Sequence, residues 1–135
     1  PITLAKKTIT GGGGTMAYCL AKSINVAAFD LMERIGPKKT VEFAHEVGIK
    51  SNIPEVPSIA LGSADISLIE MLQAYTMFPD RGFNVEPIMI TRIEDKNGNV
   101  LETFQPKTKQ VISEVDAYTM YRMMQGVIDY GTGHP

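Results

Sequence analysis

Apolar residues recur at intervals of three and four between Thr15 and Phe78, which is the spacing of one face of an α-helix. The pattern predicts helices over residues 15–22, 25–35 and 37–47, and a fourth helix that opens after Ser67. Gly36 and Gly48 follow the second and third helices, where a glycine with positive φ commonly ends a helix. We therefore expect a helical first half, with a packed loop at residues 50–62 before the fourth helix.

The apolar positions of these helices identify the faces that we expect to be buried. In the second helix they are Phe29 and Met32. In the fourth helix the apolar side chains that share one face are Leu68, Met71, Leu72, Tyr75 and Phe78. Ser67 stands three residues before Glu70, the spacing of a capping box, so the start of this helix is well defined. We expect the fourth helix to be strongly buried.

The pattern changes in "IMITRIEDKNGNVLETF", where β-branched and polar residues alternate on both sides of Asn97-Gly98. An Asn-Gly pair between such segments is a strong hairpin signal. We predict one β-hairpin over residues 88–105, followed by a helix over residues 114–129 that Ser113 caps. The expected fold class is therefore α+β, predominantly helical, with one hairpin.

The chain has 135 residues, the length of a single domain. We expect residues 1–14, which contain the run "GGGG", to form a flexible or extended lead-in, and residues 15–135 to form the folded part. No stretch approaches the ~20 apolar residues of a membrane-spanning helix. The chain begins at Pro1 without an initiator methionine, and we interpret it as part of a longer protein.

Charge and composition exclude several classes of function. The formal net charge is −2 and the basic residues are scattered, which argues against a nucleic-acid partner. Cys19 is the one cysteine, so the chain has no internal disulfide, and we expect a buried thiol. Neither His45 nor His134 has a second histidine at helical spacing in the sequence. We therefore predict no metal site and no cofactor.

Ser23-Ile24-Asn25 places two residues that disfavour helix interiors between the first two predicted helices. On a continuous helix, positions two apart point roughly 200° away from each other. A break at Ser23 would instead turn both polar side chains to the same side of a corner that Ile24 anchors in the core. The simpler alternative is that Ser23 ends one helix and Asn25 caps the next.

The residues around this corner resemble a known family. "LAKSINVAAFDLMERIG" is similar to the segment around the second active-site motif, Ser-x-Asn, of the penicillin-binding proteins. "PSIALGSADISLIEMLQAYTMFPDRG" resembles the stretch that follows this motif in the family, and "EPIMITRIEDKNGNVLE" resembles the family's next hairpin. "AYTMYRMMQGVIDYGTG" resembles the helix that leads, by way of Gly-Thr-Gly, toward the third motif. The resemblance extends from about residue 12 to residue 133 and identifies the chain as the central part of a transpeptidase domain. Among subclasses it most resembles class A, the bifunctional enzymes whose transpeptidase follows a glycosyltransferase.

The resemblance implies a serine D,D-transpeptidase that cross-links peptidoglycan stem peptides by acyl transfer and binds β-lactams. In the family the serine of Ser-x-x-Lys attacks and its lysine is the base, while a Lys-Thr-Gly strand holds the terminal carboxylate of the substrate. Ser23 matches the serine that passes a proton toward the leaving nitrogen, and Asn25 matches the asparagine that binds the substrate peptide. The implied location is periplasmic, on the extracytoplasmic face of the bacterial inner membrane, with the anchor outside this chain.

The chain also departs from the family pattern. No serine has a lysine three positions on, no Lys-Thr-Gly occurs, and the chain stops where the third-motif strand is expected. We therefore expect the chain alone to be inactive without the flanking segments of its domain, and to self-associate through uncovered helix faces. The alternative is a non-catalytic helical binding or interaction module derived from this fold. A related serine β-lactamase or carboxypeptidase shares the three-motif logic and is a further alternative.

Overall fold

The structure is a computed structural model that describes residues 14–134. Its helices are α1 (Met16–Ala21), α2 (Asn25–Ile35), α3 (Pro37–Glu46), the 3-10 helix η1 (Pro57–Leu61), α4 (Leu68–Thr76) and α5 (Glu114–Asp129). Its strands are β1 (Phe83–Val85), β2 (Arg92–Glu94), β3 (Val100–Thr103) and β4 (Thr108–Gln110). The expected fold class, α+β and predominantly helical, is confirmed. Apart from Gly14, the lead-in expected over residues 1–14 lies outside the described residues.

Three of the helices begin at a side-chain cap that the sequence supplies. The Thr15 hydroxyl oxygen accepts a backbone hydrogen bond of 3.3 Å at the start of α1. Ser67 and Glu70 form the predicted capping box of α4, and the Ser113 hydroxyl oxygen accepts a backbone hydrogen bond of 3.1 Å at the start of α5. Each cap satisfies an N–H group of the first turn that has no acceptor within the helix.

The main core lies between α3, α4 and the segment that joins them. Its buried residues are Val41, Val47, Ile49, Ile53, Ala74 and Met77. Gly48, with φ of 96°, ends α3 and lets the Ile49 N–H bond the Ala44 carbonyl at 3.1 Å, so that Ile49 folds back onto the core. The segment expected to be a packed loop is packed only in part: Ile53 is buried and Ile59 packs against the core, but Val56 and Leu61 are exposed. It also contains the helix η1, which the sequence pattern did not indicate.

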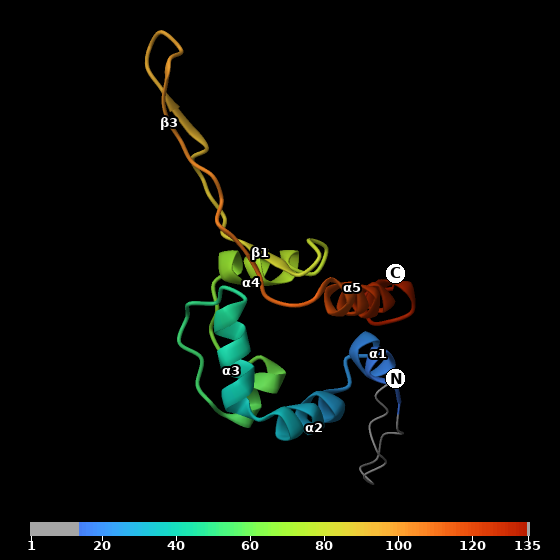
Figure 1. Ribbon diagram of the computed structural model, residues 1–135. Helices are drawn as coiled ribbons and strands as arrows, with labels where there is room; N and C mark the ends of the chain where they lie inside the picture. The colour runs from blue at the N-terminus through green and yellow to red at the C-terminus, as the bar shows by residue number, and fades with distance from the viewer. Residues whose placement is uncertain (1–13, 135) are drawn as a thin grey trace.

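A second packing unit brings the two ends of the described chain together. Helix α1 packs against α5 (Figure 1), and Ala21 and Ala117 are both fully buried, with 0% of their surface exposed. The Cys19 thiol is buried as well, as expected from its apolar neighbours. The residues just before the Ser23 corner therefore lie against the last helix of the chain.

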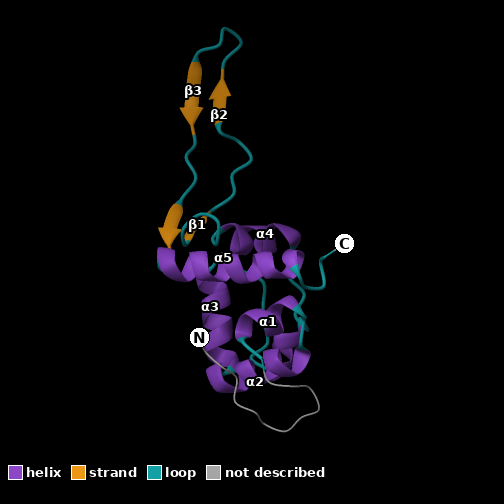
Figure 2. Ribbon diagram, turned by 90° about the vertical axis from the view of Figure 1, so that its right-hand side faces the viewer, coloured by secondary structure: helices purple, strands orange, loops and turns teal. Residues whose placement is uncertain are grey.

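The hairpin projects away from the helices as a long ribbon (Figures 1 and 2). Strands β2 and β3 pair antiparallel, as predicted, and Gly98 takes φ of 84° in the turn between them. The ribbon is longer than the one predicted hairpin, because β1 and β4 form a second antiparallel pair at its base. Phe83 pairs with Gln110, which is distant in the sequence, and the β4 sequence Thr-Lys-Gln has no alternation of apolar and polar residues. Neither a short connecting turn nor an alternating pattern therefore indicated this pair.

Two expectations about burial were wrong. Phe29 on α2 is 37% exposed, although Met32 on the same helix is buried. Helix α4 was expected to be strongly buried, but three of its apolar side chains are largely exposed: Leu68 at 85%, Leu72 at 56% and Tyr75 at 55%. The helical spacing was identified correctly, and Met71 and Phe78 pack against the main core, but the other three side chains of this face remain largely exposed.

Candidate functional site

Ser23 lies in a sharp corner between two helices. Helix α1 ends at Ala21 and α2 begins at Asn25, so the break predicted at Ser23 is confirmed. The Ser23 N–H bonds the Leu20 carbonyl at 3.0 Å, and the Ile24 N–H bonds the Cys19 carbonyl at 2.9 Å. This pair of bonds is the Schellman motif, in which the residue after the C-cap takes a left-handed conformation.

The residue in that left-handed position is usually glycine, but here it is Ser23, with φ of 54°. A side chain with a Cβ atom in this region costs about 1–2 kcal/mol. Among residues 14–134, Arg81 is the one other non-glycine residue with positive φ. A strained position that keeps a serine where glycine fits better suggests that its hydroxyl has a use.

The simpler, structural interpretation of this motif holds for Ser23, which ends α1, but not for Asn25. The N-cap of α2 is Ile24, no side chain supplies a cap hydrogen bond there, and Asn25 is the first residue of the helix. Both Ser23 and Asn25 are exposed. Within residues 14–134, no group forms a hydrogen bond with the hydroxyl of Ser23 or the amide of Asn25. The two side chains therefore retain their donors and acceptors for another molecule or another part of the protein.

A second polar cluster lies around Glu70, away from this corner. The Glu70 carboxylate accepts hydrogen bonds from the hydroxyls of Ser67 at 2.5 Å and Ser51 at 2.7 Å. It also accepts bonds from the backbone N–H groups of Lys50 at 2.7 Å and Ser51 at 2.8 Å. These donors, with the Ser67 hydroxyl contributing most, lower the Glu70 pKa from its ordinary value of 4.5 to about 2.

This cluster borders a surface depression of about 380 Å³. None of the lining residues belongs to α1, α2 or α5, so the depression is separate from the Ser23 corner. The charged groups of this depression already have partners. Lys50 Nζ lies 3.3 Å from Glu86 Oε1, and the Glu70 carboxylate accepts the hydrogen bonds described above. We interpret Glu70 as a structural clamp between the start of α4 and the segment after α3.

Within residues 14–134, no group of three or more His, Cys, Asp or Glu side chains is placed to hold a metal ion. None of the helices in this part of the chain has both the length and the apolar character that a membrane crossing requires.

Comparisons with known proteins agree with the resemblance seen around Ser23. The family profile described as "Penicillin binding protein transpeptidase domain" matches residues 3–135. Penicillin-binding protein 1A of Aquifex aeolicus is 32% identical over 121 residues, which cover 90% of this chain and 16% of that protein. Penicillin-binding protein 2D of Bacillus subtilis is 36% identical over 115 residues, which cover 85% of this chain and 17% of that protein.

Solved structures show the same fold. The crystal structure of penicillin-binding protein 1A from Haemophilus influenzae matches 99% of this chain and 26% of its own, with a TM-score of 0.83 and 23% identity. The D,D-transpeptidase domain of a peptidoglycan glycosyltransferase from Eggerthella lenta matches 90% of this chain and 38% of its own, with a TM-score of 0.76 and 21% identity. At these identities the likeness concerns the fold alone.

The chain spans about a sixth of the length of the curated relatives described above. Its match to the family profile nevertheless extends over almost every residue, and the fold agrees along the same length. The chain belongs to the transpeptidase-domain family of the penicillin-binding proteins.

Proposed function

We propose that the complete protein is a serine D,D-transpeptidase and that this chain supplies its Ser-x-Asn corner. The observation that carries the proposal is Ser23 itself. It occupies the left-handed position of a Schellman motif, where glycine is favoured, and its hydroxyl is exposed with no partner among residues 14–134. This arrangement gives up stability to expose a hydroxyl two residues before Asn25, whose amide has no hydrogen-bond partner among residues 14–134.

Each of the two side chains suits one task in acyl transfer. The departing amine of the substrate needs a proton, and a serine hydroxyl can donate one proton while it accepts another. The Asn25 amide offers both donors and an acceptor, which match the N–H and C=O groups of a peptide. The nucleophilic serine, its lysine base and the strand that holds the substrate carboxylate would come from segments outside this chain, because the chain has no Ser-x-x-Lys and no Lys-Thr-Gly.

The substrates, partners and location follow from the same proposal. The acyl donor would be a peptidoglycan stem peptide, and β-lactams would react as its analogues. Family membership supports an extracytoplasmic location at the bacterial inner membrane, with the anchor in a part of the protein outside this chain. The remaining segments of the transpeptidase domain would cover the exposed faces of α4 and α5, where Leu68 is 85% and Val115 is 73% exposed.

The experiment uses fluorescent penicillin and two substitutions in the complete protein. Ser23→Gly removes the hydroxyl but relieves the left-handed strain, so we expect a protein at least as stable as the unsubstituted one. Ser23→Ala removes the hydroxyl and keeps the strain. General acid–base groups contribute typically 10²–10⁴-fold, so we expect both variants to be acylated at least about tenfold more slowly.

The glycine variant makes this test decisive. If Ser23 served the backbone alone, Ser23→Gly would be acylated at the normal rate, and the proposed role would be wrong. If the complete protein bound no β-lactam and formed no acyl-enzyme at all, the alternative of a non-catalytic binding module would hold. We further expect that the 135-residue chain by itself is not labelled at any serine, because the nucleophile is absent from it.

A further inference from the structure

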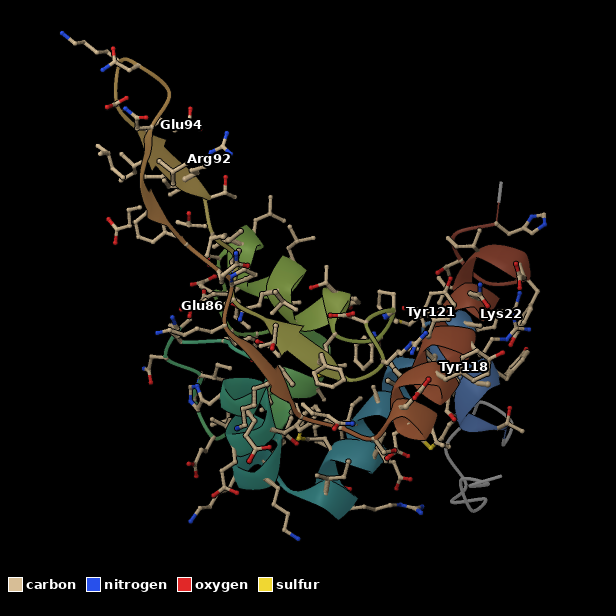
Figure 3. The ribbon with its side chains drawn as sticks, turned by 45° about the horizontal axis from the view of Figure 1, so that its top comes forward. Lys22, Glu86, Arg92, Glu94, Tyr118 and Tyr121 are labelled. Carbon is tan, nitrogen blue, oxygen red and sulfur yellow. The ribbon has the colours of Figure 1, made fainter. Side chains whose placement is uncertain are left out.

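The residue just before Ser23 is attached to the far end of the chain. Lys22 is the C-cap of α1, and its Nζ donates a hydrogen bond of 2.5 Å to the main-chain carbonyl of Tyr130. These two residues are 108 positions apart in the sequence. Figure 3 shows Lys22 beside the C-terminal half of α5, on the side of the molecule where α1 meets that helix.

The acceptor of this bond is one that a lysine is suited to satisfy. Tyr130 is the C-cap of α5. The carbonyl groups at the end of a helix have no N–H donor within the helix, and they form the negative end of the helix dipole. No acidic side chain among residues 14–134 pairs with the Lys22 ammonium. The Lys22 side chain is therefore committed to the end of α5.

A hydrogen bond between main-chain atoms also joins the end of α1 to the segment after α5. The Thr132 N–H donates to the Ala21 carbonyl at 3.0 Å. Between these two contacts lies Gly131, and a Cβ atom built there would be 2.3 Å from the Ala21 oxygen and 2.6 Å from the Val127 oxygen. Both atoms are backbone, so neither can turn away, and only glycine allows this close approach. The "YGTG" sequence after α5 thus holds the end of α1 by its backbone.

We propose that Lys22 and Gly131 are positioning residues that fix the Ser23 hydroxyl for its proton transfer. This inference rests on the proposed role of Ser23. A proton relay requires hydrogen-bond reach of about 2.6–3.2 Å, and a misplacement of about 1 Å can cost on the order of 10²-fold in rate. Ser23 directly follows the anchored residue, so a corner released from α5 loses this placement even though the hydroxyl itself is still present.

The test uses the complete protein and separates the rate of acylation from the binding of penicillin. Lys22→Met keeps the length and the apolar stem but removes the donor. We expect the limiting acylation rate at saturating fluorescent penicillin to fall about 5- to 20-fold, with an apparent dissociation constant changed less than about twofold. Lys22→Arg keeps a donor at the end of the side chain, and we expect it to restore the rate to within about threefold of the unsubstituted protein.

A double substitution tests whether Lys22 acts through Ser23. In Ser23→Gly there is no hydroxyl left to position, so adding Lys22→Met should cause no further loss of rate. Gly131→Ala should lower the limiting rate at least as much as Lys22→Met, because its methyl group displaces the Ala21 carbonyl. If Gly131→Ala fails to fold, the inference is decided by Lys22→Met and the double substitution, each checked for a thermal midpoint no lower than that of the protein without Lys22→Met.

The outcomes distinguish this inference from the proposed function. A slow Ser23→Gly variant together with a Lys22→Met variant that is acylated at the normal rate would overturn the positioning role alone. Losses that multiply in the double variant would also overturn it, because Lys22 would then act independently of Ser23. A Ser23→Gly variant with a normal rate would instead remove the proposed function on which the inference rests.

Discussion

At the scale of single residues, the Glu70 carboxylate makes the stability of this fold depend on pH. Its pKa is lowered to about 2 by hydrogen bonds from Ser67, Ser51 and the backbone of Lys50. A carboxyl whose pKa is depressed in the folded state stabilises that state fully above its ordinary pKa of 4.5, and the contribution disappears as the pH falls toward about 2. We predict that Glu70→Gln lowers the urea midpoint of unfolding at pH 7, and that the difference shrinks between pH 4.5 and pH 2.

A matched control for this prediction is Glu42→Gln on α3. Glu42 is exposed, and no group within residues 14–134 forms a hydrogen bond or ion pair with its carboxylate. The Glu42 variant should therefore follow the unsubstituted chain at every pH. A constant difference between Glu70→Gln and the unsubstituted chain from pH 7 down to pH 2 would show that the hydrogen-bonded carboxylate does not cause the loss.

The residues of the candidate site differ in how far the sequence could identify them. Ser23 and Asn25 could be found because two polar residues interrupted a helical pattern, and because a local motif matched the family. Lys22 and Gly131 could not, since Lys22 bonds Tyr130, 108 positions away, and Gly131 lies against Ala21, near the other end of the described chain. The left-handed conformation of Ser23 also had no local signal, because a serine at that position resembles an ordinary helix end.

At the scale of elements, the outer ribbon is expected to be nearly independent of the helices. The main core contains no residue of β2 or β3, and all seven residues of these strands are exposed. We predict that replacing residues 89–104 by a short Gly-Ser turn leaves the helical circular dichroism unchanged and shifts the thermal midpoint by less than about 2 °C. The β1–β4 pair, with Val85 opposite Thr108, would close the shortened ribbon.

Gly82→Ala provides the contrasting control at the base of the ribbon. Gly82 has φ of 89°, and a Cβ atom there would be 2.2 Å from the Ile112 carbonyl oxygen. One methyl group at this position should therefore lower the midpoint more than removal of the whole outer ribbon, by about 3 °C or more. If the shortened ribbon proved the more damaging change, the strands would contribute to the stability of the helical body after all.

The elements that the sequence predicted well are those whose signals are local. The helix caps at Ser67 and Ser113 and the turn at Gly98 depend on neighbouring residues, and all three are present. The β1–β4 pair depends on residues far apart in the chain, and it was missed. The apolar face of α4 was recognised, but its burial was not predictable, because periodicity identifies a face without showing what covers it.

At the scale of the whole molecule, these uncovered faces predict that the isolated chain self-associates. Leu68 and Leu72 lie one turn apart on α4 and are 85% and 56% exposed, and Val115 and Tyr118 on α5 are 73% and 61% exposed. Exposed apolar surface of this kind drives association in water. We predict that the 135-residue chain sediments above its monomer mass of 14.8 kDa at high micromolar concentration.

The double variant Leu68→Gln, Leu72→Gln should sediment closer to that mass, since glutamine keeps helix propensity but removes the apolar surface. Leu101→Gln on the ribbon, where the side chain is 67% exposed, is the control that should leave association unchanged. An unsubstituted chain that remains a monomer, or an equal effect of Leu101→Gln, would mean that the α4 face is not the surface through which the chains meet.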